Sequence, residues 1–336
     1  MRALDPDAAG SRLARGGSDL PDTNVTYHDQ PMLKRPRWGI EVITYLFLGG
    51  LMGGTGMLIG IAGRSKLAGD VALTQRARFV ALALATACPP VLIKHLGRPE
   101  RFLNMLRVVK LKSPMSLGVW GLVGFSGAAG LASAGELVRM GVLPRGLRFL
   151  VGPPGLMNVP LLVMGAFIAG YTGVLISATA IPLWGAGKRH IPAMCVCSGM
   201  AGACALNAAI AVAAPGDNAA TVHRLEQLEA LASIAEAAII LHFERASGHY
   251  GTPMFTGERG AKLRRWTLGI GIGLPLLINA PSLFARGKHH EGRANTLKTL
   301  LTSALTLAGG YVLRETLIEA GKGSADDPIA ASRQPE

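Results

Sequence analysis

The chain has 336 residues, of which 49% are hydrophobic and only 16% are charged, and its formal net charge is +13. Soluble domains carry roughly a quarter charged residues, so this composition favours a membrane protein. A long soluble domain is excluded, because no segment outside the apolar ones exceeds about 40 residues. The positive charge does not indicate nucleic-acid binding, because the lysines and arginines lie at the ends of apolar segments, where they meet membrane lipid headgroups.

Eight apolar segments follow one another, each close to the length of about 20 residues that spans a bilayer as a helix. We therefore predict an all-α integral membrane protein, a bundle of about eight transmembrane helices with both termini on one side. The bundle is expected to occupy residues 38–316, between disordered polar tails at residues 1–37 and 317–336. The segments are Ile40–Gly63, Thr74–Ile93, Met115–Leu137, Leu156–Leu183, Ile191–Ala214, Thr221–Phe243, Trp266–Ala285 and Thr296–Leu313.

Small residues crowd the first segment, which contains six glycines between positions 49 and 60. Gly49 and Gly53 have the spacing that lets two membrane helices approach closely. Close helix packing is the main expectation for this surface, and a backbone surface that faces a flat ligand is the alternative.

Ionisable side chains within an apolar segment are costly in a bilayer, so each is a candidate for function. Glu41 lies about one turn into the first segment and Tyr45 follows four residues later, so both project from one helix face. A carboxylate and a phenol there could hydrogen-bond an oxygen of a bound ligand and exchange its protons. Alternatively, Glu41 reaches the membrane interface or pairs with Arg35 or Arg37.

The sixth segment carries Glu226, Glu229, Ser233 and Glu236, whose spacing places all four on one helix face. Three carboxylates on one stripe cannot comfortably face lipid, so they must face the bundle interior, a water-filled cavity or basic partners. Glu236 is the deepest and is a candidate to transfer protons or to bind a ligand within the membrane. Glu226 and Glu229 could instead lie at the water interface beside Arg224.

Two further positions are candidates on chemical grounds. Tyr171 lies deep in the fourth segment, where its hydroxyl needs a partner, for which a neighbouring carbonyl would suffice. His95 opens an arginine-rich stretch after the second segment, His95-Leu-Gly-Arg-Pro-Glu-Arg-Phe-Leu-Asn-Met-Leu-Arg107, which runs on to Ser113-Pro-Met-Ser116. The imidazole of His95 could accept a proton, and a capping role is equally open.

That stretch resembles the NrfD family, the quinone-facing membrane subunits of polysulfide-reductase-type complexes. Two other stretches share the resemblance: Trp38-Gly-Ile-Glu-Val-Ile-Thr-Tyr-Leu-Phe-Leu-Gly-Gly-Leu-Met-Gly-Gly54 and Gly170-Tyr-Thr-Gly-Val-Leu-Ile-Ser-Ala-Thr179. The resemblance covers about residues 27–316. It implies that polar residues near the start of the first helix and Tyr171 of the fourth contact the quinone. It also implies that the loop with His95 and Arg98 shapes the mouth of the quinone site and the docking face of an iron–sulfur subunit.

The resemblance implies menaquinone or ubiquinone as the cofactor, a 4Fe-4S ferredoxin-type subunit and a molybdopterin catalytic subunit as partners, and the bacterial inner membrane as the location. No haem or metal is expected in the chain itself, because its histidines lie in tails, loops or segment ends and its four cysteines lack a ferredoxin or zinc spacing. We therefore predict a membrane anchor that exchanges electrons between the quinone pool and the iron–sulfur subunit and handles the associated protons. A secondary transporter or ion-conducting protein is the alternative, since broken helices and intramembrane carboxylates also fit that class.

Overall fold

The computed structural model describes residues 33–65, 67–95, 100–107, 109–110, 112–147, 155–215, 218–284, 293–327 and 330–331. Within these ranges the chain forms helices joined by turns and no strand. The all-α class predicted from the sequence is therefore confirmed. Arg98, predicted to contribute to the quinone site, lies outside the described residues.

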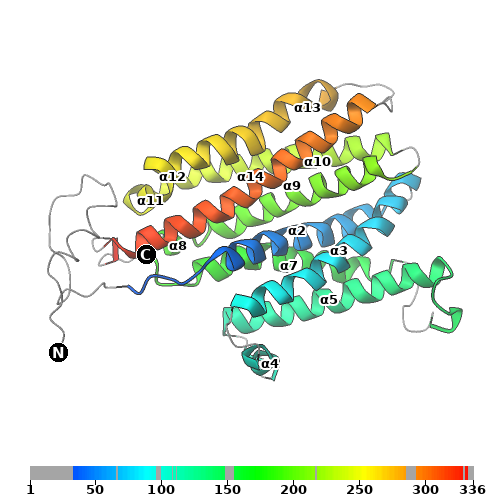
Figure 1. The fold of residues 1–336 in the computed structure, drawn as a ribbon, viewed down its shortest axis with the longest axis horizontal. Coiled ribbons are helices and arrows are strands. Elements are labelled where there is room, and N and C mark those ends of the chain that lie inside the picture. The colour runs from blue at the N-terminus through cyan, green and yellow to red at the C-terminus, as the bar shows by residue number, and fades with distance from the viewer. Residues whose placement is uncertain are drawn as a thin grey trace.

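Long helices lie side by side and form a bundle (Figure 1). The π-helix η3 continues α12 directly into α13, so these three elements make one rod. We call the end at which α2 begins and α14 ends the proximal end, and the end at which α2 ends and α14 begins the distal end. The long elements are α2 (Ile40–Ala62), α3 (Ala68–His95), α5 (Pro114–Arg139), α7 (Asn158–Ser177), α9 (His190–Ala213), α10 (Ala219–Ser247), α12 (Gly257–Lys262), η3 (Leu263–Gly273), α13 (Leu274–Phe284) and α14 (Arg293–Ala325).

Five of these helices are long and apolar enough to cross a membrane, namely α2, α3 from Gly69, α5, α7 and α9. They confirm that the chain is an integral membrane protein. The helices α10 and α14 and the rod α12–η3–α13 lie beside them in the same bundle (Figure 1). A total of eight crossing helices remains a prediction.

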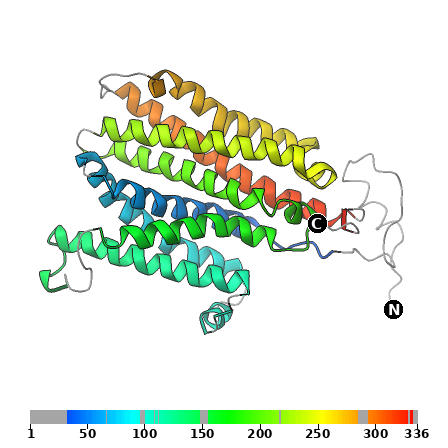
Figure 2. The ribbon, with the colours of Figure 1, turned by 180° about the vertical axis from the view of Figure 1, so that it is seen from behind.

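The helices fall into two groups (Figure 2). The first contains α2, α3, α5 and α7, and the second contains α9, α10, the rod and α14. The two groups meet mainly where α2 packs against α9, with further contacts between α7 and α9 and between α2 and α14. As a result, α2 lies at the centre of the molecule and most of its side chains are buried.

Glycines bring the backbone of α2 against both neighbouring helices. A Cβ on Gly53 would lie 2.6 Å from the backbone of α7, at the oxygen of Gly165. A Cβ on Gly54 would lie 2.2 Å from the backbone oxygen of Gly199 on α9. Only glycine fits these two positions, because any larger residue would force the helices apart. The expectation that small residues of the first segment mediate close packing is confirmed.

Short elements join the long helices at the two ends. The sequence predicted that the fourth segment would run to Leu183, but α7 ends at Ser177 because Pro182 begins the separate helix α8. At the start of α5, the side chain of Ser113 accepts from the backbone N–H of Ser116 and caps the helix. The short elements are α4 (Glu100–Arg107), η1 (Arg145–Leu147), α8 (Pro182–Ala186), η2 (Gly248–Gly251) and α11 (Thr252–Phe255).

The last helix is longer than the apolar segment in the sequence. That segment ends at Leu313 and the polar tail was expected from residue 317, whereas α14 continues to Ala325. The reason is tertiary packing against α8. The indole nitrogen of Trp184 donates to the backbone oxygen of Leu317 over 3.0 Å, and a Cβ on Gly321 would lie 2.0 Å from the Trp184 ring.

Candidate functional site

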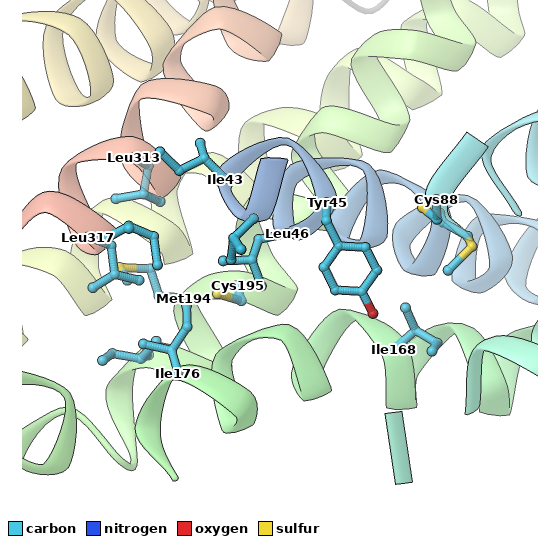
Figure 3. Packing of buried hydrophobic residues seen from close by; sticks show 14 of the residues in the cluster. Ile43, Tyr45, Leu46, Cys88, Ile168, Ile176, Met194, Cys195, Leu313 and Leu317 are labelled. Atoms are coloured by element: carbon cyan, nitrogen blue, oxygen red, sulfur yellow. The ribbon is translucent and has the colours of Figure 1, made fainter. Parts of the chain in front are cut away.

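Two buried tyrosines from different helices meet inside the first group of helices. Tyr45 of α2 and Tyr171 of α7 are each only 6% exposed. The Tyr45 side chain points from α2 toward α7, in the direction of Ile168, which lies one turn before Tyr171 (Figure 3). The Tyr45 phenol is close enough to the Tyr171 phenol and to the Cys88 thiol of α3 to interact with both electrostatically. The structure therefore brings these two predicted site residues together.

Packing fixes the orientation of the Tyr171 ring. The ring lies against α5, where a Cβ on Gly118 would be 2.0 Å from the carbon that carries the hydroxyl. The ring of Phe167, one turn earlier on α7, stacks on Tyr171 with 5.8 Å between the ring centroids. The glycine on one side and the aromatic ring on the other leave the phenol little freedom, which is the condition for a preorganised hydrogen-bond donor.

Glu41 lies at the proximal rim, one helical turn outside Tyr45. Its carboxylate is 3.8 Å from the ammonium group of Lys94, the penultimate residue of α3. The Glu41 side chain is 29% exposed, so it can exchange protons with water. This contact differs from the expected pairing with Arg35 or Arg37, and Arg35 instead lies 3.7 Å from Asp326. His95 follows Lys94 at the end of α3 and is partly buried.

Glu236 lies away from the tyrosines, between α9, α10 and α14. It is 3% exposed and hydrogen-bonded to the side chain of Ser198 on α9. The Ser198 hydroxyl in turn accepts a hydrogen bond from the guanidinium group of Arg314. Because Tyr45 points toward α7 inside the first helix group and Glu236 lies among helices of the second, the structure does not place Glu236 beside Tyr45.

Glu226 and Glu229 are also buried, at 5% and 3% exposed. The hydroxyl of Thr299 donates to Glu226 over 2.9 Å, and the hydroxyl of Thr306 donates to Glu229 over 2.6 Å. Both threonines belong to α14. The stripe of carboxylates on α10 therefore faces the bundle interior. Arg224 points elsewhere and forms an ion pair of 2.7 Å with Asp70.

Sequence analysis did not single out Arg314, although it is 2% exposed. Besides Ser198, its guanidinium group donates to the backbone oxygens of Gly310, over 3.2 Å, and of Cys195, over 3.4 Å. Gly50 of α2 makes room for it, since a Cβ there would lie 3.0 Å from a guanidinium nitrogen. A sequence signal for Arg314 does exist. Leu313 precedes it and Leu317 and Ile318 follow it, so the apolar helix pattern extends past the arginine on both sides.

A second buried cluster near the distal end was also missed. Arg78 of α3 forms an ion pair with Glu136 of α5 and donates to the side-chain oxygen of Asn158 on α7 over 2.7 Å. Arg139 lies 3.2 Å from the same carboxylate. The side chains of Arg78 and Glu136 are 5% and 1% exposed. The cluster ties three helices together and contains none of the predicted site residues.

The part of the chain that the structure describes holds no group of three or more His, Cys, Asp or Glu side chains that could bind a metal ion. The cysteines are free thiols, and Cys88, Cys195 and Cys204 are buried. The rings of His190 and His242 lie 5.1 Å apart, and among the described residues no third ligand joins this pair.

Comparison with protein families finds a match that spans nearly the whole chain. The family model described as "Polysulphide reductase, NrfD" matches residues 26–323. Proteins of this family interact with quinones in general and typically associate with iron–sulfur and molybdopterin subunits. Among curated individual proteins, none matches the chain.

Proposed function

The chain belongs to the NrfD family, and from this premise we propose that it is the quinone-binding membrane subunit of a polysulfide-reductase-like oxidoreductase. It exchanges electrons between menaquinone or ubiquinone in the bacterial inner membrane and a peripheral 4Fe-4S ferredoxin-type subunit. A molybdopterin enzyme completes the complex. The observation that carries the proposal is the pair of buried phenols, Tyr45 and Tyr171, with Glu41 at the rim above them.

These residues fit a quinone by their chemistry. A bound quinone supplies two-electron, two-proton chemistry, whereas the protein supplies binding, orientation and proton handling. The hydroxyls of Tyr45 and Tyr171 donate hydrogen bonds, which stabilise negative charge on an oxygen placed between them. The low exposure of both phenols keeps water away and strengthens these interactions.

Glu41 is suited to move a proton between that site and the proximal surface. Its carboxylate lies one turn from Tyr45, and its partial exposure keeps it in contact with water. Lys94, 77% exposed, lies 3.8 Å from the carboxylate and leaves it open to water. His95 follows Lys94 and is a second group that can accept a proton, and Arg98 completes the proposed mouth of the site.

The iron–sulfur subunit is proposed to dock at the proximal end. The connection between α3 and α5 lies there and exposes the cationic side chains of Arg107, Lys110 and Lys112. Positive charge on this surface fits an acidic partner surface and steers its approach. Docking at this end brings the partner close to Glu41 and the tyrosines.

The proposal is tested with Tyr171→Phe and Glu41→Gln in the purified complex. Each change removes one functional group and keeps the shape, so we expect normal insertion and assembly. Quinol-driven reduction of the iron–sulfur clusters should slow by about tenfold or more, because a bond to a charge-developing oxygen or a proton carrier is lost. Reduction of the same clusters by dithionite bypasses the quinone and should be unchanged.

Matched controls are Tyr250→Phe in η2 and Glu258→Gln in α12, which lie outside the tyrosine site. Both should keep the wild-type rate of quinol-driven cluster reduction. If Tyr171→Phe and Glu41→Gln also keep that rate, the quinone does not bind between α2 and α7.

A further inference from the structure

The proposed quinone site is buried, so its ligand needs an opening to the lipid. Tyr45 and Tyr171 are each only 6% exposed. A membrane quinone carries a long apolar tail, which is most stable in the hydrocarbon of the bilayer while the head group binds the protein. The candidate openings are the interfaces between neighbouring helices around the two tyrosines.

Two of these interfaces are closed by contact between helix backbones. Between α2 and α7, a Cβ on Gly53 would lie 2.6 Å from the backbone oxygen of Gly165. Between α7 and α9, a Cβ on Gly173 would lie 2.5 Å from the Cα atom of Pro192. Helices that touch through their backbones have no side chains there that can move aside, so a tail does not pass between them.

The hydroxyl of Tyr171 lies at a third interface, between α5 and α7. A Cβ built on Gly118 of α5 would be 2.1 Å from the phenolic oxygen, and one built on Gly121 would be 2.4 Å from the ring of Phe167. Phe167 and Tyr171 are four residues apart and share a face of α7. Two aromatic rings of α7 therefore lie on a glycine surface of α5.

This interface is held differently at its two ends. Near the distal end, polar contacts anchor α5 to α3, since the Ser133 hydroxyl donates to the backbone oxygen of Arg78 over 3.0 Å and Glu136 pairs with the Arg78 side chain. In the proximal half, the rings of Phe167 and Tyr171 rest on glycine backbone. A ring there moves aside by a change of side-chain rotamer, which leaves the helix backbones in place.

Phe167 joins the lipid to the phenol. It lies midway along α7 (Asn158–Ser177), which is long and apolar enough to span the membrane, and it is 38% exposed. The exposed part of the ring is therefore at the depth of the hydrocarbon. The ring also stacks on Tyr171, with 5.8 Å between the centroids. One apolar side chain thus reaches from the lipid to the residue that faces the quinone head group.

We propose that the quinone enters from the lipid between α5 and α7, and that Phe167 binds the part of its isoprenoid tail next to the head group. This inference rests on the proposed quinone function. Tyr171 lies one helical turn closer to the proximal end than Phe167, so the head group lies toward the proximal surface and the tail runs toward the middle of the membrane. The substrate is consequently a quinone with an apolar tail, which the protein distinguishes from a tail-less quinone.

Photolabelling of the whole complex locates the opening directly. The probe is a decylubiquinone analogue with a diazirine on the tail, close to the head group. Mass spectrometry should find the label on α5 and α7 near Gly121 and Phe167, and an excess of unmodified decylubiquinone should suppress it. Label on α3 or α9 instead, or label that decylubiquinone does not suppress, would overturn the proposed opening.

A kinetic test compares decylubiquinol with the same quinol without a tail, as electron donors to the iron–sulfur clusters. Phe167→Ala should slow both, because the ring also holds Tyr171, so the measured quantity is the ratio of the two kcat/KM values. We expect this ratio to fall by about fivefold, since the lost tail contact is comparable to the burial of about one CH2 group. Phe167→Leu keeps an apolar side chain and should restore most of the ratio.

The matched control is Trp120→Ala on α5. Trp120 is an aromatic residue of nearly the same exposure as Phe167, at 37%, but it lies on a different face of α5 from Gly118 and Gly121. Its kcat/KM ratio for the two quinols should equal that of the wild type.

The outcomes separate the opening from the quinone site. An unchanged ratio in Phe167→Ala would show that Phe167 acts only on Tyr171 and does not bind the tail, and it would leave the quinone function intact. An equal fall in Trp120→Ala would mean that the tail has no specific place at the α5–α7 interface. Wild-type turnover of both quinols in Tyr171→Phe would contradict the proposed quinone site itself.

Discussion

At the scale of single residues, the molecule depends on a few charges that are buried with their partners. The clearest case is the pair Arg78 and Glu136, which also contacts Asn158 and Arg139. A buried ion pair adds little net stability compared with apolar residues of the same size, but removal of one partner leaves an uncompensated charge. We therefore expect the free energy of unfolding to fall when one partner is removed and the other stays charged. It should change little when both charges are removed together.

We predict that Glu136→Leu lowers the free energy of unfolding by about 3 kcal/mol or more, because Arg78 loses its carboxylate in a buried place. The double change Arg78→Met with Glu136→Leu should recover most of that loss. Thermal unfolding in detergent measures both. Equal destabilisation in the single and double variants would mean that the pair itself stabilises the fold.

These residues also show which buried polar groups the sequence could identify and which it could not. Glu41, Tyr45 and the α10 glutamates were found because a polar group in an apolar segment is visible along one helix. Arg78 and Arg314 were missed because they lie near the ends of apolar segments, where arginine ordinarily reaches lipid headgroups. Their burial depends on Glu136 and Ser198, which belong to other helices, and no periodicity within one segment reveals such a partner.

At the scale of helices, the glycine positions determine which helix surfaces pack in close contact. Gly54 faces the backbone of α9, whereas nothing lies within 4 Å of a Cβ built on Gly127 of α5. The sequence predicted close packing from the glycines of the first segment. It could not identify α7 and α9 as the two partners, because helix neighbours are set by the packing of the whole chain.

We predict that Gly54→Ala strongly reduces the amount of folded protein, because its Cβ would lie 2.2 Å from the Gly199 oxygen and force α2 away from α9. Gly127→Ala should be neutral or stabilise by up to about 1 kcal/mol, since alanine is the better helix former. Size-exclusion profiles and melting temperatures in detergent distinguish the two. Normal folding of Gly54→Ala would show that the α2–α9 contact tolerates a shift.

At the scale of the whole molecule, both described ends of the chain lie at the proximal end. Arg35, before α2, is 3.7 Å from Asp326, after α14. This arrangement requires an even number of crossings between them. An even number agrees with the predicted eight helices. Of the described helices, five meet the length and composition of a membrane span.

We predict that Glu258→Cys, near the start of α12, is labelled from one side of the membrane and Arg145→Cys, in η1, from the other. A cysteine at position 35 should be labelled from the same side as one at position 258. An impermeant maleimide applied to right-side-out and inverted vesicles makes the measurement. Labelling of positions 35 and 258 from opposite sides would contradict the even count.

The central position of α2 also has a consequence for how the chain is made. This helix is synthesised well before α7 and α9, yet its two glycine faces fit those two helices. Until α9 arrives, the surface around Gly54 contacts lipid or an insertion factor and not its final partner. The two halves of the protein therefore cannot fold independently. A chain truncated after α7 keeps an uncovered helix-packing surface around Gly54, which membrane quality control can recognise.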